Sequence, residues 1–293
     1  MSIRKLAASS IIIILILFSY TLAFSGNTEA TPEEKQEYER DYNRVADLRA
    51  SLEQSDARDM DAYEALADDI DQKWRGRHKE YQARLMLEIC RPLSSGIFRE
   101  DRQYELAREY ALSALDEPDN IPLILELELM GHVITFIIGR GAPSGDDFAE
   151  KRSKDTGARL HAWKRLLEAI DPNRDPDEVI WGGNVPPPAA TGLSPGVDPA
   201  AIQDAELRTE YEKAIRINKQ KVQKRHEQNQ YHKWLKRFPT RSESYIIRAY
   251  SHPPYATEEL RNMLDNQLPD QEAKARIIEA VEKNIQESQE GMR

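Results

Sequence analysis

Cysteine is almost absent from this sequence: Cys90 is the single one among 293 residues. A lone cysteine cannot form an internal disulfide, so the fold must be held together by its hydrophobic core. A chain of this length is long enough to bury one or two such cores. We expect Cys90, within LMLEICRPL, to be a buried apolar residue near a helix end and not a reactive thiol.

Motifs of the common catalytic and nucleotide sites are also missing. The sequence contains no Gly-x-Ser-x-Gly elbow and no His-Glu-x-x-His metal motif. The stretch IIGRGAPSGDD departs from a phosphate loop, because five residues separate Gly139 from Gly145 and Asp146 stands in the place of the lysine. His226 and His232 are six residues apart and face different sides of a helix. The sequence therefore predicts no cofactor and no catalytic residue.

Basic residues are fewer than acidic ones, 41 against 51, which gives a formal net charge of −10. Such a chain is not expected to bind nucleic acid in general, which requires cations that neutralise phosphates. The charge is uneven: residues 29–71 hold fifteen acidic and five basic residues, and residues 208–248 hold twelve basic and four acidic ones. Opposite charges attract over about 8 Å at physiological salt. One hypothesis is that the acidic block docks near the basic block, within one molecule or between two, which cross-linking would test.

Long apolar runs are limited to the N-terminus. Arg4 and Lys5 precede a run of 19 residues from Leu6 to Phe24. This pattern predicts a signal peptide over residues 1–25 and an exported protein, periplasmic or extracellular. Because about 20 residues span a bilayer, an uncleaved membrane tether through residues 6–24 is the alternative.

Strand-type alternation is scarce, and helical periodicity is what remains. Residues 31–54 begin with Thr31, Pro32 and Glu34, the signature of a capping box, and continue as an amphipathic helix. A second helix is predicted over residues 59–89, with Gly76 as a weak point. Pro92 and the Ser-Ser-Gly that follows it end this helix.

Small residues recur in the next helix. Ala107, Ala111, Ala114, Leu115 and Pro118 have a spacing that resembles the second helix of a tetratricopeptide repeat. The resemblance covers half a repeat, the proline comes one position early, and no 34-residue period recurs. It implies packed helical hairpins, in which the small residues let a neighbouring helix approach closely.

The most apolar internal segment is IPLILELELMGHVITFIIG. Asn120 and Pro122 are typical of a helix start and Gly139 of a helix end, so we predict a central core helix and not a strand. His132 in this helix is expected to be a buried histidine with a hydrogen-bond partner. Glu126 would be a candidate for a perturbed pKa if it is buried.

The rest of the chain predicts two further helical parts around a segment rich in proline and glycine. A helix is expected over residues 147–170, and residues 171–199 contain seven prolines and four glycines, which favours a linker. A long helix is predicted over residues 200–238, followed by shorter helices. The predicted fold is therefore all-α, with packed helical hairpins (solenoid-like or a bundle) in residues 26–170, a linker at 171–199 and a second helical domain at 200–293.

The linker DPNRDPDEVIWGGNVPPP carries a weak calcium pattern and one tryptophan. Asp171, Asn173 and Asp175 match the first three ligand positions of an EF-hand loop. Pro176 replaces the turn glycine and Gly182 the bidentate glutamate, so no metal site is predicted. Trp181 is either a ligand-facing edge or a plug that holds the linker on the helical body.

The basic helix RINKQKVQKRHEQNQYHKWLKRF is the strongest remaining signal. Its cations and aromatic residues are suited to an anionic polymer or to acidic lipid headgroups. The alternative is a solvated helix whose aromatic residues pack at its C-terminal end. Together with Trp181, the ligand-facing candidates are Lys233, Trp234, Lys236 and Arg237.

These observations favour an exported binding or scaffold protein of a bacterial-type cell envelope, with a protein or an anionic envelope polymer as its partner. An envelope enzyme with a carboxylate-based site between the two helical parts is one alternative. A membrane-anchored factor that binds anionic polymer or lipid through the basic helix is another. The oligomeric state does not follow from the sequence.

Overall fold

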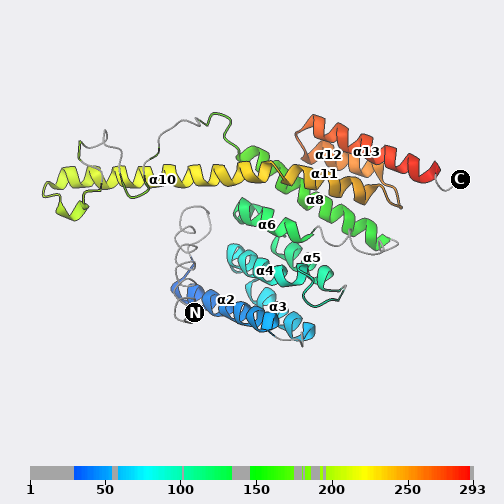
Figure 1. The fold of residues 1–293 in the computed structure, drawn as a ribbon, viewed down its shortest axis with the longest axis horizontal. Coiled ribbons are helices and arrows are strands. Elements are labelled where there is room, and N and C mark those ends of the chain that lie inside the picture. The colour runs from blue at the N-terminus through cyan, green and yellow to red at the C-terminus, as the bar shows by residue number, and fades with distance from the viewer. Residues whose placement is uncertain are drawn as a thin grey trace. The chain divides into compact units, whose positions relative to one another are not determined.

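The computed structural model of this protein describes residues 30–54, 59–100, 102–133, 146–174, 180, 182–185, 192–193 and 196–290. Within these ranges the chain forms helices and no strand, which confirms the all-α prediction. The chain divides into two compact units, Met1–Ala142 and Pro143–Arg293 (Figure 1). The predicted signal peptide lies outside the described residues.

The first unit consists of helices that pack one after another. They are α2 (Pro32–Gln54), α3 (Met60–Trp74), α4 (Lys79–Ser94), α5 (Arg102–Ala114), the short 3-10 helix η1 (Pro118–Asn120) and α6 (Leu123–Val133). α4 is the central element, because it packs against α2, α3, α5 and α6 (Figure 1). The predicted helix in the most apolar segment is confirmed as α6, although residues 134–145 lie outside the described ranges.

The helices of this unit begin with caps. The Thr31 amide donates to Glu34 Oε2 at 2.9 Å, and the Glu34 amide donates to Thr31 Oγ1 at 3.1 Å. These two bonds are the reciprocal pair of the predicted capping box, which is confirmed. Asp59 accepts from the Ala62 amide at 2.9 Å and starts α3 in the same way.

The helix predicted over residues 59–89 is two helices, α3 and α4. The chain leaves the helical path at Gly76, whose φ is +77°, a backbone conformation that glycine adopts without steric cost. His78 then caps α4 by accepting from the Tyr81 amide. The weak point that the sequence indicated at Gly76 is therefore a complete reversal of the chain.

The small residues of α5 allow α4 to approach closely. Ala107, Ala111 and Ala114 are fully buried, and the Cys90 thiol donates to the Ala107 carbonyl at 3.2 Å. Cys90 is itself fully buried, and burial raises the pKa of its thiol far above the ordinary value. The prediction of a buried cysteine near a helix end is confirmed.

The second unit contains the remaining helices. They are α8 (Asp146–Ala169), the 3-10 helix η2 (Pro199–Ala201), α10 (Ala205–Leu235), α11 (Phe238–Tyr250), α12 (Thr257–Gln267) and α13 (Gln271–Glu290). The predicted long helix thus begins at Ala205 and not at residue 200. Asp198 caps only η2, and the side chain of Asp204 caps α10.

The boundary between the two units differs from the predicted one. The sequence predicts residues 147–170 as the last helix of the N-terminal part, but α8 packs against α10, α11 and α12 in the second unit. Its apolar face, with Leu160, Trp163 and Leu166 fully buried, was visible in the sequence. Periodicity shows that a face is buried but not which helix covers it, so the boundary was placed one helix too late.

The segment rich in proline and glycine lies along α10, wherever it is described (Figure 1). The Asn218 side-chain amide donates to the Gly182 carbonyl at 2.8 Å and to the Val185 carbonyl at 2.6 Å. Gln228 accepts from the Asp171 amide at 3.0 Å and donates to the Ala169 carbonyl at 2.8 Å. The predicted linker is therefore held on a helix of its own unit.

A buried ionic cluster joins α8 to α11. Arg159 is fully buried and lies 4.4 Å from the ring centre of Tyr245, whose hydroxyl donates to Asp155 at 3.0 Å. Burial lowers the pKa of Arg159 to about 10, and Tyr245 and Asp155 oppose that shift. Arg152 lies 4.3 Å from the ring centre of Tyr250 and donates to the Pro254 carbonyl at 2.9 Å.

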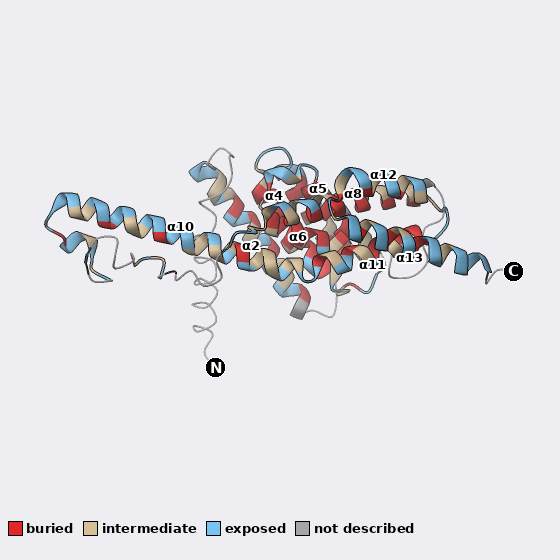
Figure 2. Cartoon of the chain, turned by 90° about the horizontal axis from the view of Figure 1, so that it is seen from above, coloured by how far each residue is buried: buried red, intermediate tan, exposed pale blue. Residues whose placement is uncertain are grey.

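Most of α10 remains in contact with solvent. Of its 31 residues only Tyr211, Asn218 and Gln228 are buried, and Figure 2 shows this helix mainly in the colours of exposed and intermediate residues. Among the helices that the structure describes, none combines the length and the apolar character needed to cross a bilayer.

Candidate functional site

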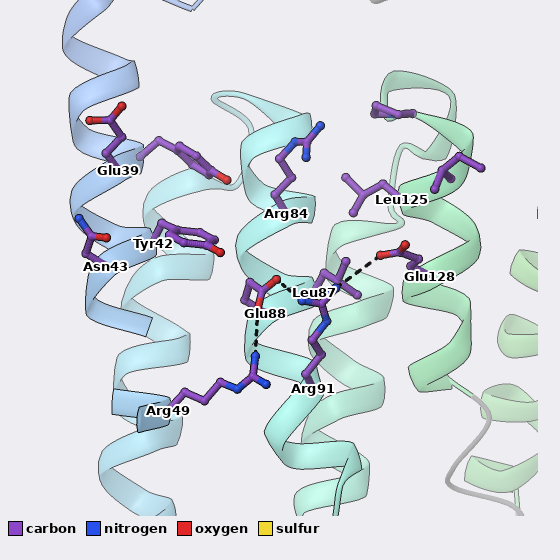
Figure 3. A pocket seen from close by; sticks show the side chains of 13 residues that line it. Glu39, Tyr42, Asn43, Arg49, Arg84, Leu87, Glu88, Arg91, Leu125 and Glu128 are labelled. Carbon is purple, nitrogen blue, oxygen red and sulfur yellow. Dashed lines mark hydrogen bonds and ion pairs between the residues drawn. The ribbon is translucent and has the colours of Figure 1, made fainter. Parts of the chain in front are cut away.

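A groove of about 670 Å³ lies between α2, α4 and α6 in the first unit (Figure 3). This volume is within the range of about 300–1,000 Å³ that is usual for ligand sites. The lining residues are two tyrosines, an aliphatic set, three arginines and polar or acidic side chains: Tyr38, Tyr42, Leu87, Pro122, Ile124, Leu125, Arg49, Arg84, Arg91, Glu39, Asn43, Glu88 and Glu128.

Tyr38 and Tyr42 form the aromatic wall on α2. They are four residues apart on one face of the helix, with ring centres 6.1 Å apart. Tyr38 also stacks on Tyr81 of α4 at 4.3 Å, which fixes the distance between the two helices. Burial raises the pKa of both wall tyrosines above the ordinary value, so their hydroxyls stay protonated and can donate to a ligand.

The charged side chains of the groove connect its three helices. Arg49 of α2 lies 3.4 Å from Glu88 of α4, and Arg91 of α4 pairs with the same carboxylate. Arg91 also lies 3.6 Å from Glu128 of α6 (Figure 3). Since a guanidinium has five N–H donors, this chain of ion pairs both ties the walls together and presents donors to the groove.

Asp41 holds the aromatic wall of α2 in place through hydrogen bonds with α3. This carboxylate has no exposed surface and accepts from Lys73 at 2.7 Å, from the Trp74 indole at 2.9 Å and from Arg44 at 3.1 Å. Burial alone would raise the pKa of Asp41, but the hydrogen bonds from Lys73, Trp74 and Arg44 outweigh burial and lower it. Asp41 stands between Tyr38 and Tyr42 in the sequence, so its contacts with α3 set the position of both rings.

His132 closes the end of α6 against α4. Its Nδ1 lies 2.8 Å from the Ser94 hydroxyl, and the ring is half-buried. The expectation of a partnered histidine is confirmed. Burial, with a smaller contribution from the charge of Arg91, lowers the pKa of His132 to about 4.

The depressed pKa of His132 predicts a loss of stability in weak acid. The unfolded chain takes up the proton near its ordinary pKa of about 6.5, before the folded protein does, so stability falls as pH drops from about 6.5 towards 4. We expect the free energy of unfolding to decrease by about 1–2 kcal/mol between pH 7 and pH 5, which allows for a ring that is only half-buried. Urea unfolding of His132→Gln should lack this decrease, and exposed His252→Gln should retain it. Equal pH dependence in both variants would contradict the assignment.

The calcium pattern is not assembled into a metal site. Asp171 accepts from the Asn173 amide at 2.9 Å, which is a local turn, and lies 3.7 Å from Lys224 of α10. Asp175 and Trp181 lie outside the described residues. Within the parts of the chain that are described, no three His, Cys, Asp or Glu side chains gather as metal ligands.

The other ligand-facing candidates lie where α10 ends and α11 begins. Lys233, Lys236 and Arg237 are exposed, and Trp234 is half-buried. The Arg237 guanidinium lies 4.1 Å from the ring centre of Trp234, which in turn meets Phe238 edge to face at 6.2 Å. These aromatic residues pack at the helix end, as the alternative interpretation of the basic helix expected.

No family model matches this sequence, no curated protein is significantly similar to it, and no solved structure matches it. The geometry of the groove therefore carries the functional argument.

The groove was not predicted from the sequence. The spacing of Tyr38 and Tyr42 indicates only the apolar stripe of a helix, and Arg49, Arg84 and Arg91 are spread over two helices with no motif between them. The available signal was the placement of Arg84 and Arg91 two turns apart on one helix, and of Arg49 two turns after Tyr42 on another, since tyrosine and arginine are enriched in binding sites.

Proposed function

We propose that this protein is a binding protein whose first unit holds a short segment of a partner protein in the groove between α2, α4 and α6. The observation that supports this proposal most directly is the lining itself. Two tyrosines and three arginines surround an aliphatic floor of Leu87, Ile124 and Leu125, and tyrosine and arginine dominate the energetics of protein recognition.

The lining also indicates the chemistry of the bound segment. Apolar side chains would pack on the aliphatic floor and on Tyr42, and a carboxylate would accept from Arg84 or Arg91, because arginine binds carboxylates with two parallel hydrogen bonds. Glu80 holds Arg84 in place by accepting from its Nε and one Nη at 3.0 and 2.7 Å, so a ligand carboxylate would bind the other edge of the guanidinium. The predicted export signal supports a place for this binding protein in the cell envelope.

Selection from displayed random peptides tests this proposal. We expect selected peptides to combine apolar residues with an acidic residue. The double variant Tyr42→Ser with Ile124→Ser should bind them about 10- to 100-fold more weakly, because it removes two apolar contacts worth about 1 kcal/mol or more each.

The matched control is Leu48→Ser with Leu66→Ser, which changes two half-exposed apolar residues of α2 and α3 outside the groove. Peptides that bind both double variants as tightly as the wild-type protein would place the binding surface elsewhere and overturn the proposal. Circular dichroism and thermal unfolding would establish that both variants remain folded.

The alternative of an envelope enzyme with a carboxylate-based site remains a prediction. Glu88 and Glu128 both line the groove, but each is paired with Arg91. Both carboxylates are therefore already bonded to a guanidinium, an arrangement that suits binding better than proton transfer.

A further inference from the structure

A second surface, independent of the groove, lies on α10. No acidic residue occurs between Glu212 and Glu227, whereas the same stretch contains six cations. The cations of this stretch are Lys213, Arg216, Lys219, Lys221, Lys224 and Arg225. All of them except Arg225 are exposed.

Ile217 lies in the middle of these cations. It is 45% exposed, and among the described residues it is the only large hydrophobic side chain that is exposed. Lys213 precedes it by four residues, and Lys221 and Lys224 follow by four and seven, so all four share one face of the helix. We name this set, with Arg216, the α10 cation face.

A neighbouring side of the helix is already occupied. Tyr211 and Asn218 are buried, and Asn218 binds the carbonyls of Gly182 and Val185. Within the second unit, the segment rich in proline and glycine therefore covers one side of α10 and leaves the cation face in contact with solvent. Lys224 lies 3.7 Å from Asp171, but its side chain is 67% exposed, and an ion pair at that exposure contributes little.

We propose that the α10 cation face binds an anionic lipid surface, with the helix lying in the plane of the headgroups. Each lysine or arginine close to such a surface contributes about 1 kcal/mol. Ile217 would enter the boundary between headgroups and acyl chains, and the stems of the flanking lysines would cover apolar surface while their charges remain at the phosphates.

The apolar residue distinguishes a lipid surface from a soluble polyanion. A soluble polyanion is bound by charge alone, and an exposed isoleucine adds nothing to that interaction. The net charge of −10 does not prevent local binding, because physiological salt screens charges that are more than about 8 Å away.

Sedimentation with vesicles tests this proposal in the full chain. Vesicles of phosphatidylcholine alone measure any contribution of the apolar run at residues 6–24, and vesicles that also contain phosphatidylglycerol measure the added effect of anionic lipid. We expect the triple variant Lys213→Gln, Arg216→Gln and Lys224→Gln to lose roughly 100-fold of the anionic preference. Ile217→Gln should lose about three- to tenfold.

The matched control is Arg261→Gln, Arg276→Gln and Lys283→Gln on α12 and α13, which removes the same charge from exposed positions of the same unit. An equal loss in this control would show that net charge and not the α10 cation face decides binding, and would overturn the proposal. Soluble polyphosphate that binds as tightly as the anionic vesicles, together with no effect of Ile217→Gln, would overturn it in favour of a polyanion site.

Discussion

Replacement of Asp41 by alanine is expected to lower the free energy of unfolding by about 2–4 kcal/mol, because it leaves the fully buried Trp74 indole without its acceptor and takes one of two carboxylate partners from Lys73 and from Arg44. Asp41 has no exposed surface, and three donors from α2 and α3 converge on it. Asp41→Asn should lose about half as much, since the amide oxygen can still accept from the Trp74 indole. Urea unfolding measures both variants.

The control is Asp47→Ala, an exposed position on the same helix, which should change stability by less than about 0.5 kcal/mol.

Because the pKa of Asp41 is lowered in the folded protein, the stability that Asp41 contributes depends on pH. Its contribution is complete above the ordinary pKa of 3.8 and is lost as pH falls through the lower pKa of the folded state. The difference in free energy of unfolding between the wild-type protein and Asp41→Asn should therefore become smaller below about pH 4. A difference that stays constant there would contradict the assigned charge.

The buried cluster of the second unit predicts a comparable loss for Asp155→Ala. This substitution removes a carboxylate whose charge opposes the lowered pKa of the fully buried Arg159, and it removes the acceptor of the Tyr245 hydroxyl. Removing one of two opposite charges from a buried cluster costs about 3–5 kcal/mol. Thermal or urea unfolding followed by circular dichroism should show a loss of that size.

A second substitution separates the charge effect from simple loss of contacts. Adding Arg159→Met to Asp155→Ala should recover most of the stability, because a buried pair replaced by apolar side chains is often neutral. Lys164 and Glu168 provide a matched pair with the same spacing on α8, 3.8 Å apart and exposed. Glu168→Ala should cost less than about 0.5 kcal/mol. Losses that simply add in the double variant would show that charge is not the cause.

Helix type and many helix ends could be predicted, because they depend on residues close in sequence. Thr31 and Glu34 fix the start of α2, and the spacing of small residues in α5 indicated close packing, which the contact of Cys90 with Ala107 shows. The partner of each helix could not be predicted in the same way. α8 has an unmistakable buried face, but nothing local to that face distinguishes α6 from α10 as its neighbour.

The candidate site depends more than the helix ends do on residues that are far apart in the sequence. Arg91 is three residues from Glu88 but 37 from Glu128, and only the packing of α4 on α6 brings the second carboxylate within 3.6 Å. The amides of Asn218 and Gln228 are likewise ordinary polar residues in the sequence. Their role, which is to bind backbone carbonyls of the preceding segment, depends on the fold and not on any local pattern.

Asn218 and Gln228 bind the backbone of the segment before α10 as a receptor binds a peptide, except that this segment belongs to the same chain. A few side-chain amides would bind a separate peptide of this composition very weakly, since each hydrogen bond contributes about 1 kcal/mol. Attachment at both ends instead supplies an effective concentration on the order of millimolar. A separate peptide would therefore have to exceed this effective concentration to replace the Gly182 and Val185 carbonyls on Asn218.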